Sequence, residues 1–325
     1  MFVSGAEPPP SPSFHRTQQA VLLNAKYLMK KSRRHIWLLA VILLSTMCIG
    51  GYAIYDNGRP APIPLKKRLY EGVTYHRVVS YLPRPMIAHV LVIDTRTPGL
   101  QLFITPPEEG WKMAEHPLKA RTTTQFLEDF GVQIAINGDG FTPWWSHGPL
   151  DYYPHEGDPV TPNGVAASQG KLYADGSQTE EVGIIPTLYV SRSNALSFND
   201  PPNRVFQAIS GDRMLVMQGE PVDDLDASEL DPRTAIGINR NGRWLYIVVV
   251  DGRQPFYSDG ATFARLADIL IDFGAYTGMA LDGGGSSTMV VEGEDGNPAV
   301  LNSPIDQYVP GRERPVANHL GIYLK

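Results

Sequence analysis

The chain has 325 residues, 42% of them hydrophobic and 19% charged, with a formal net charge of −6 at pH 7. This composition is typical of a folded protein with a sizeable core, and no basic block lies beyond the first 70 residues, which argues against a nucleic-acid partner. Cys48 is the only cysteine, so an intrachain disulfide, a cysteine-ligated zinc ion and a thiol nucleophile in the globular part are excluded. The 31 glycines and 28 prolines favour a β-rich fold with many turns.

The N-terminal region is predicted to anchor the chain in a membrane. Residues 1–35 form a tail whose first 20 residues are proline- and serine-rich, which indicates disorder, and whose last part is basic. Residues 36–55 carry no charge, and about 20 such residues span a bilayer. Because basic residues stay on the cytoplasmic side, we expect a single-pass protein with a cytoplasmic N-terminus and a periplasmic or otherwise extracytoplasmic domain. The alternative is a cleaved signal peptide, although the preceding tail is long and no A-x-A site follows.

The first half of the globular part reads as a strand-rich unit with one helix. Residues 56–70, which contain three prolines, are predicted as a stiff linker, and residues 71–325 as the domain. Strands are expected over 73–79, 88–93 and 100–104, the last two pairing as a hairpin. A helix over 122–130 ends at a glycine, and a buried strand over 132–136 leads into Asn137-Gly-Asp-Gly-Phe141.

The later half repeats this order of elements. Strands over 234–238 and 244–250 flank an Asn-Gly turn, a helix covers 262–273, and a short strand over 279–281 ends in Asp282-Gly-Gly-Gly. We infer an internal ββαβ-type duplication, and therefore an α+β fold of two similar halves with mixed sheets. The loops after Asn137 and Asp282 would then be related by a pseudo-twofold axis and could face one another. The alternative is a coincidence between short motifs.

Two segments between the halves complete the chain. Strands expected over 164–173, 184–190, 205–210 and 214–217 indicate an inserted β-meander, and the acidic loop 223–231 is predicted to be a solvated surface. The aromatic loop 141–159 contains Trp144, Trp145 and His155, and flat apolar faces edged by polar groups suit a carbohydrate. The alternative is a loop that packs on its own aromatic residues. His147 and His155 lack the spacing of a metal motif, so the metal stays unknown: a divalent cation is possible, but no cofactor is required.

Candidate chemistry collects at strand ends. Asp251 and Asp282 each follow an apolar strand, and the three glycines after Asp282 offer backbone amides to an anion. Arginine suits a phosphate because its planar fork binds two oxygens. Taken singly, Asp251 is better explained by a turn and each arginine by a surface ion pair. Together they fit a phosphorylated or glycosidic substrate, with this candidate binding set: Arg233, Arg253, Arg314, Gly283, Gly284, Gly285, Ser286, Ser287, Trp144, Trp145 and His155.

Five motifs in this order resemble the phosphodiester glycosidase family. They are Asn137-Gly-Asp-Gly-Phe141, Arg233-Thr-Ala-Ile-Gly237, Val250-Asp-Gly-Arg253, Leu281-Asp-Gly-Gly-Gly-Ser-Ser-Thr-Met289 and Arg314-Pro-Val-Ala-Asn318. The family includes the lysosomal uncovering enzyme, which removes N-acetylglucosamine from a mannose 6-phosphate diester, and bacterial proteins described as exopolysaccharide-related. The resemblance covers roughly residues 75–325 and implies an α+β fold with two similar halves. The first loop departs from the family's usual Asn-Gly-Gly-Phe-Phe, and the additional carboxylate of Asp139 leaves the substrate in doubt.

The resemblance implies an exported hydrolase that cleaves a sugar-1-phosphodiester in envelope or exopolysaccharide metabolism. Asp282 or Asp251 would act as nucleophile or base, Asn137 would hold a sugar hydroxyl, and Asp139 completes the catalytic set. One alternative is a non-catalytic protein that binds or assembles glycans for polysaccharide export. A weaker one is a scaffold of two cystatin-like halves.

Overall fold

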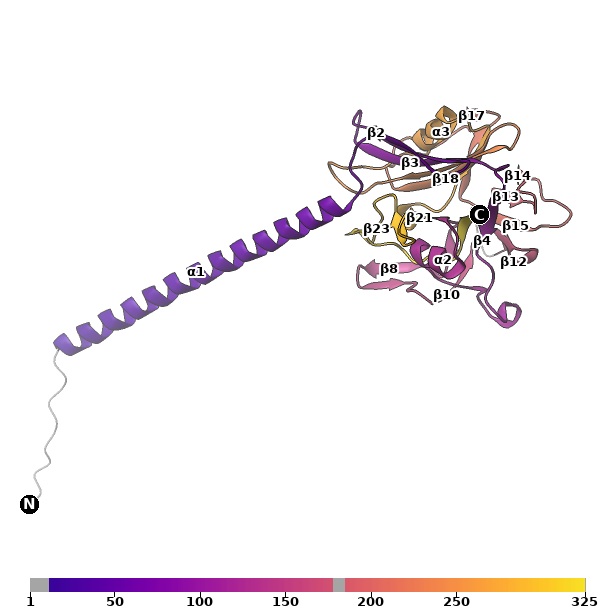
Figure 1. The fold of residues 1–325 in the computed structure, drawn as a ribbon. Coiled ribbons are helices and arrows are strands. Elements are labelled where there is room, and N and C mark those ends of the chain that lie inside the picture. Colours follow the sequence, from indigo (N-terminus) through magenta and orange to yellow (C-terminus); the bar gives the residue numbers. More distant parts are fainter. Residues whose placement is uncertain (1–11, 178–184, 325) are drawn as a thin grey trace, which may run out of the picture. The chain divides into compact units, whose positions relative to one another are not determined.

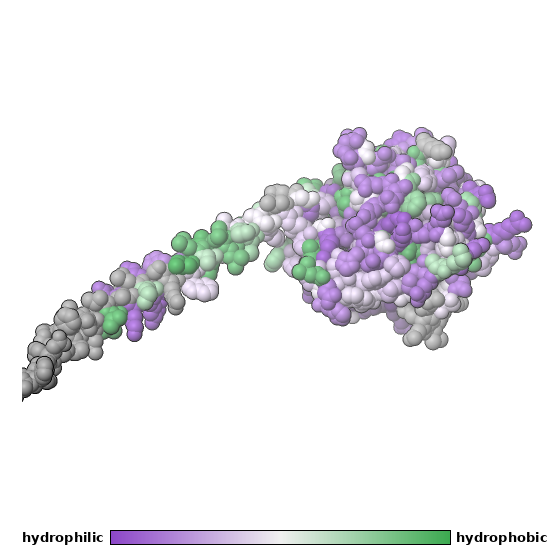
Figure 2. Space-filling view, turned by 90° about the horizontal axis from the view of Figure 1, so that it is seen from below, coloured by the Kyte–Doolittle hydropathy of each residue, from purple (hydrophilic) through white to green (hydrophobic). Residues whose placement is uncertain are grey.

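The computed structural model describes residues 12–177 and 185–324, and the chain divides into two compact units, Met1–Gly58 and Arg59–Lys325. The first unit contains helix α1 (Pro12–Gly58), within which Leu22–Ala53 is long and apolar enough to cross a membrane. A signal sequence near the N-terminus would have the same length and composition. Figure 2 shows apolar side chains gathered along α1, whereas the visible face of the globular unit is mostly hydrophilic.

The ends of the N-terminal segments differ from the prediction. Helix α1 already includes residues 12–20 of the expected tail, because no proline interrupts the sequence between Pro12 and Gly58. Residues 1–11 of that tail lie outside the described part of the chain. The linker predicted over 56–70 is also too long, since β1 (Leu65–Tyr70) pairs with β2 (Val73–Ser80). The prolines stop at Pro64, so the following amides are available to an edge strand.

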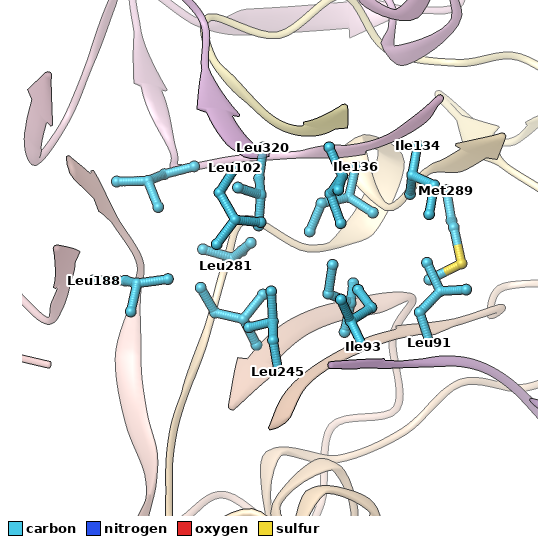
Figure 3. Packing of buried hydrophobic residues seen from close by; sticks show 14 of the residues in the cluster. Leu91, Ile93, Leu102, Ile134, Ile136, Leu188, Leu245, Leu281, Met289 and Leu320 are labelled. Atoms are coloured by element: carbon cyan, nitrogen blue, oxygen red, sulfur yellow. The ribbon is translucent and has the colours of Figure 1, made fainter. Parts of the chain in front are cut away.

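Two antiparallel sheets pack face to face and enclose the main core. The first has the order β1-β2-β3-β19-β18-β20-β16-β17, and the second has the order β22-β21-β6-β25-β4. Leu91, Ile93 and Leu245 of the first sheet meet Leu102 and Leu320 of the second (Figure 3). The remaining strands of the first sheet are β3 (Met86–Asp94), β16 (Arg213–Met217), β17 (Glu220–Pro221), β18 (Arg233–Ile238), β19 (Trp244–Val250) and β20 (Thr277–Ala280). Those of the second are β4 (Gln101–Ile104), β6 (Ile134–Asn137), β21 (Met289–Glu292), β22 (Pro298–Val300) and β25 (His319–Tyr323).

One helix covers the outer face of each sheet (Figure 1). Helix α3 (Phe263–Asp272) buries Leu266 and Leu270 against the first sheet, and α2 (Thr123–Phe130) buries Phe126 against the second. Both helices begin at a threonine whose hydroxyl accepts a backbone N–H of the first turn. The result is an α+β fold of four layers, which confirms the expected fold class. In the described ranges every strand pairing is antiparallel, so the expectation of mixed sheets is wrong.

The duplication is visible in the topology, although the sheet of the first half is completed by β25, from the far end of the sequence. Helix α2 connects β4 to β6 with β25 between them, and α3 connects β19 to β20 with β18 between them. Each helix therefore joins two strands of equal direction that a third, antiparallel strand separates. The predicted hairpin of 88–93 with 100–104 is wrong, because β3 pairs with β2 and β19 whereas β4 pairs with β25. A turn between two apolar strands does not reveal that they enter facing sheets.

The insertion forms a third sheet, of order β12-β11-β15-β13-β14. Its strands are β11 (Val165–Ser168), β12 (Lys171–Asp175), β13 (Thr187–Val190), β14 (Leu196–Phe198) and β15 (Gln207–Ser210). The predicted meander is wrong in order, since β15 lies between β11 and β13 and the next strand, β16, joins the first sheet. Ile184, the start of one predicted strand, lies outside the described residues. Short elements complete the unit: η1 (Trp111–Met113), β5 (Leu118–Lys119), β7 (Phe141–Thr142), β8 (Trp145–Gly148), β9 (Asp151–Tyr153), β10 (Pro159–Pro162), η2 (Gly284–Ser286), β23 (Ile305–Asp306) and β24 (Val309–Pro310).

Candidate active site

The loops that follow β6 and β20 contact each other directly. The side-chain amide of Asn137 donates to the carbonyl oxygen of Asp282 at 2.7 Å, and the Asp282 amide donates to the carbonyl of Gly138 at 3.0 Å. The Asn137 side-chain oxygen accepts from the Thr234 hydroxyl at 2.8 Å and from the Thr288 amide at 3.2 Å. These bonds occupy both ends of a fully buried amide. Asn137 therefore links the two halves, instead of offering its side chain to a sugar hydroxyl as expected.

The Asp282 carboxylate begins a chain of polar contacts. It is partly exposed, and its Oδ2 accepts from the Ser286 hydroxyl at 2.5 Å. The same Ser286 oxygen accepts from Nη1 of Arg314 at 3.2 Å, and Nε of Arg314 donates to Oδ1 of buried Asp306 at 2.8 Å. Arg312 completes the chain with Nη2 at 3.2 Å from Oδ2 of Asp306. Burial raises the pKa of Asp282, while the charge of Arg314 and the Ser286 hydrogen bond oppose this rise.

Glycine is required at positions 284 and 285, because the backbone there passes close to the guanidinium groups of Arg253 and Arg314. A Cβ at Gly285 would meet Oδ1 of Asp306 and would lie 2.6 Å from Nη2 of Arg314. A Cβ at Gly284, where φ is +59°, would lie 2.8 Å from Nη2 of Arg253. The short helix η2 therefore runs against two guanidinium groups. The neighbouring Ser287 hydroxyl is buried and has no hydrogen-bond partner among the described residues.

The arginines predicted to bind substrate are held in different ways. Arg253 forms two bonds to Asp231, from Nε to Oδ1 at 2.6 Å and from Nη2 to Oδ2 at 2.9 Å, and its guanidinium lies 5.3 Å from the centre of the Tyr308 ring. Asp231 belongs to the loop that we expected to be a solvated surface, and this expectation is wrong for it. Arg233 is buried and donates to the carbonyls of Ala261 and Glu229, so its guanidinium mainly holds backbone.

Asp251 lies in a buried hydrogen-bond chain rather than beside the glycines. Its Oδ2 is 2.9 Å from Nε2 of His89, whose Nδ1 is 2.8 Å from the Tyr75 hydroxyl. Oδ1 of Asp251 accepts from the Ser303 amide at 2.6 Å. The side chains of His89 and Asp251 are inaccessible to solvent. This arrangement indicates a structural role for Asp251 and leaves Asp282 as the accessible carboxylate of the predicted pair.

Two further carboxyl groups, those of Asp139 and Asp212, interact electrostatically with Asp282. Asp139 is buried, and its Oδ2 accepts from the Gly164 amide at 2.6 Å. Burial, reinforced by the charge of Asp282, raises the pKa of Asp139 to about 7, against the opposing Gly164 bond. Asp212, which precedes β16, raises the pKa of both and forms an ion pair with Arg213 at 2.9 Å. Asp212 was not predicted as a site residue, and its one sequence signal is the preceding glycine, Gly211, where the structure shows that a Cβ would collide with the Ala280 carbonyl.

The aromatic loop reaches this site through one tryptophan. The Arg314 guanidinium lies 5.3 Å from the centre of the Trp144 ring, and the Ser146 hydroxyl donates to Oε1 of Gln307 at 2.5 Å. Trp145 is 40% exposed and packs within the β8–β9 hairpin, and His155 packs on Tyr152. The predicted contribution of Trp144 therefore has a contact to support it, whereas Trp145 and His155 contact their own loop.

The metal prediction has no candidate ligand set to test it. Across residues 12–177 and 185–324, no three histidine, cysteine or acidic side chains are grouped so that they could hold an ion. The site assembled by the fold is thus a partly exposed carboxylate, a glycine backbone and two paired arginines, with Trp144 and Tyr308 at their faces.

Comparison with known structures identifies related folds. The chain aligns with the catalytic domain of zebrafish N-acetylglucosamine-1-phosphodiester alpha-N-acetylglucosaminidase, auto-inhibited by its pro-peptide, with 21% identity and a TM-score of 0.54, covering 82% of this chain and 85% of the zebrafish one. A hypothetical protein from Synechocystis shares 16% sequence identity and aligns with a TM-score of 0.52. The alignment covers 82% of this chain but less than two thirds (64%) of the Synechocystis one. An exported protein from Burkholderia pseudomallei shares 17% identity and aligns with a TM-score of 0.51, covering 77% of this chain and 76% of the Burkholderia one.

Sequence comparison gives the family. A search of curated protein sequences returns no match. A sequence profile described as phosphodiester glycosidase matches residues 130–323, which is more than half of the chain and includes both loops that meet at Asn137 and Asp282. The chain therefore belongs to the phosphodiester glycosidase family.

Proposed function

We propose that this protein is a membrane-anchored, exported hydrolase that cleaves the bond between C1 of a sugar and the phosphate of a sugar-1-phosphodiester. The observation that carries the proposal is the Asp282–Ser286–Arg314 chain, because it places an accessible carboxylate beside cationic groups and a glycine backbone. Family membership supports a hydrolase of this kind. The zebrafish relative is named for an N-acetylglucosamine-1-phosphodiester, which suggests the first substrate to try.

The proposed reaction needs charge binding more than acid catalysis. A phosphomonoester is a good leaving group, so Arg314, Arg253 and the amides of Gly283–Gly285 would hold its charge as the C1–O bond breaks. The Ser286 and Arg314 contacts favour the ionised form of Asp282. Asp282 then either attacks C1 to form a glycosyl ester that water hydrolyses, or takes the proton of an attacking water. In both routes the water oxygen ends on the sugar, and the phosphomonoester leaves.

Anchoring is proposed from the composition of α1. Its apolar stretch covers a bilayer, and the basic residues before it would remain cytoplasmic, so the globular unit would function outside the cytoplasm on envelope or exopolysaccharide material. N-terminal sequencing of the membrane-associated protein tests this. An intact N-terminus supports an anchor, and a new N-terminus after residue 55 would indicate a cleaved signal sequence.

The test of the chemistry is hydrolysis of an N-acetylglucosamine-1-phosphodiester by the full chain in H₂¹⁸O. The proposal expects the ¹⁸O on the sugar; label on the phosphate would identify a phosphodiesterase and refute the glycosidase proposal. The anomer formed first, followed by proton NMR, distinguishes retention from inversion. Asp282→Asn should abolish turnover, whereas Asp268→Asn, on the exposed side of α3, should leave it unchanged.

A glycan-binding protein without catalysis is the second candidate. It is favoured by the exposure of Trp144 and Trp145, 49% and 40%, because stacking on a sugar requires no carboxylate. Glycan binding by the wild type without any turnover would support this candidate. Turnover that is lost in Asp282→Asn while binding persists would exclude it.

A further inference from the structure

Three strongly exposed apolar side chains lie around the arginines of the candidate site, and we call them the apolar rim: Phe256, Tyr308 and Leu150. Their exposed fractions are 96%, 73% and 94%. The Tyr308 ring lies on the Arg253 guanidinium. Phe256 is in the tight turn that follows Arg253 in the sequence, in which Gln254 and Ser258 exchange backbone hydrogen bonds. Leu150 is at the tip of the β8–β9 hairpin, next to Pro149, whose carbonyl accepts from Arg312 at 2.8 Å.

Two of these residues have an unusual backbone conformation. Phe256 and Tyr308 have φ of +67° and +57°, in the left-handed region that non-glycine residues rarely adopt. Such conformations are unfavourable by roughly 1 kcal/mol or more, and they occur where function requires them. Large apolar side chains in these turns, almost fully exposed for Phe256 and mostly exposed for Tyr308, indicate a contact with something apolar.

The first residues of the globular unit lie next to this rim. The guanidinium of Arg59, the first residue of the globular unit, lies 4.2 Å from the centre of the Tyr257 ring, and the Tyr257 hydroxyl donates to the Pro60 carbonyl at 2.9 Å. Tyr257 directly follows Phe256. Only residues 56–58 separate Arg59 from the apolar segment that ends at Tyr55, a reach of at most about 14 Å. The chain therefore enters the globular unit beside the turn that carries Phe256.

We propose that the apolar rim enters the membrane interface and that the substrate is a sugar-1-phosphodiester whose second ester is a membrane lipid. This inference rests on the proposed function and on the proposed anchor. The headgroup layer is about 5–8 Å thick on each side, so a lipid phosphate lies at the depth where a rim of this kind meets the bilayer. Arg253 and Arg314 would receive the lipid phosphate, and the sugar would lie over Asp282. Hydrolysis would then release the sugar and leave a lipid monophosphate in the bilayer, with the water oxygen on the sugar.

Activity against two substrates tests the proposal. The full chain is reconstituted in phosphatidylcholine vesicles and supplied either with an N-acetylglucosamine-1-phosphodiester of a long-chain polyprenol in the same bilayer or with its water-soluble methyl phosphodiester. Phe256→Asn and Leu150→Asn should each lower the rate on the lipid substrate by roughly tenfold to a hundredfold, the effect expected for one buried apolar side chain, and should not change the rate on the methyl phosphodiester. Met113→Asn is the matched control, since Met113 is 94% exposed and lies in η1, outside the rim.

A measurement without turnover completes the test. In a Cys48→Ser background, a bimane dye attached at Phe256→Cys should be quenched by lipids brominated on their acyl chains, and a dye at Met113→Cys should not. Equal quenching at both positions, or equal loss of lipid-substrate activity in the rim and control variants, would overturn the proposal. If the wild type hydrolyses the methyl phosphodiester but shows neither rim effect, this inference fails and the proposed function stands. If neither substrate is hydrolysed while Phe256→Cys is quenched, the proposed function fails and the membrane contact stands.

Discussion

Replacing Ser286 with alanine removes the hydroxyl that connects the Asp282 carboxylate to Arg314. The hydroxyl donates to Oδ2 of Asp282 at 2.5 Å and accepts from Nη1 of Arg314 at 3.2 Å. The first bond favours the ionised carboxylate, so its loss adds to the effect of burial, which already raises the pKa of Asp282. We expect the pKa to rise further in Ser286→Ala.

The size of the effect follows from the hydrogen bond that is lost. A bond to a charged group contributes about 1.5–3 kcal/mol, which corresponds to a pKa change of roughly 1–2 units. If the reaction needs ionised Asp282, the acidic limb of the profile of kcat/KM against pH should move to higher pH by this amount. At pH values below the shifted limb, kcat/KM of the variant should be about tenfold lower than that of the wild type for each unit by which the pKa of Asp282 has risen.

The assay is hydrolysis of a soluble N-acetylglucosamine-1-phosphodiester between pH 4 and 9. Ser287→Ala provides the matched control, because the Ser287 hydroxyl is equally buried but makes no hydrogen bond within the described residues. This variant should keep the limb of the wild type. An unchanged limb in Ser286→Ala, or the same shift in both variants, would refute the assignment of Asp282 as the group that must be ionised.

Further outcomes follow from neighbouring contacts. Gly285→Ala should lower kcat/KM by up to about a hundredfold, because the new Cβ would lie 2.6 Å from Arg314 Nη2 and displace the guanidinium, and a misplacement of about 1 Å has an effect of this size. Asp251→Asn should lower the free energy of unfolding by ~1–3 kcal/mol, seen as a lower Tm, because it disturbs the hydrogen bonds to His89 and Ser303, while turnover per folded molecule is kept. Asp282→Asn should show the opposite, an unchanged Tm with turnover lost. The Tm of Asp139→Asn relative to wild type should rise between about pH 4 and 7, because the pKa of this carboxyl is 3.8 ordinarily and about 7 in the folded state, so that wild-type stability falls as pH rises through this window.

The position of the site was predictable because its loops have strong local signals. A buried apolar strand that ends in a polar residue and glycines occurs at both Asn137 and Asp282, and the internal repeat was sufficient to expect that the two loops meet. The repeat also predicted the two helices and the strands that follow them. The pairing of β4 was not predictable, since its partner β25 lies more than 200 residues away in the sequence.

The roles of individual side chains depended on partners that no local pattern indicates. Asp251 is a reasonable candidate from its place at the end of a strand, but His89, from a distant part of the chain, contacts its carboxylate. Asn137 is occupied by Thr234 in the same way. Asp306 was missed because neither a strand end nor a glycine run precedes it, although it orients Arg314. Sequence patterns located the backbone of the site, and long-range pairing decided which charged groups remain accessible.

The completion of the second sheet by β25 sets the order of events in biosynthesis. This strand, His319–Tyr323, lies between β6 and β4, and it is the last element of the described chain to leave the ribosome. Until then β6 lacks its partner, and the Asn137 loop lacks the Asn318 side chain that accepts from the Asp139 amide. The second sheet therefore cannot close until β25 has emerged from the ribosome. Folding of the globular unit has to wait for the synthesis of His319–Tyr323, although most of its residues are made earlier.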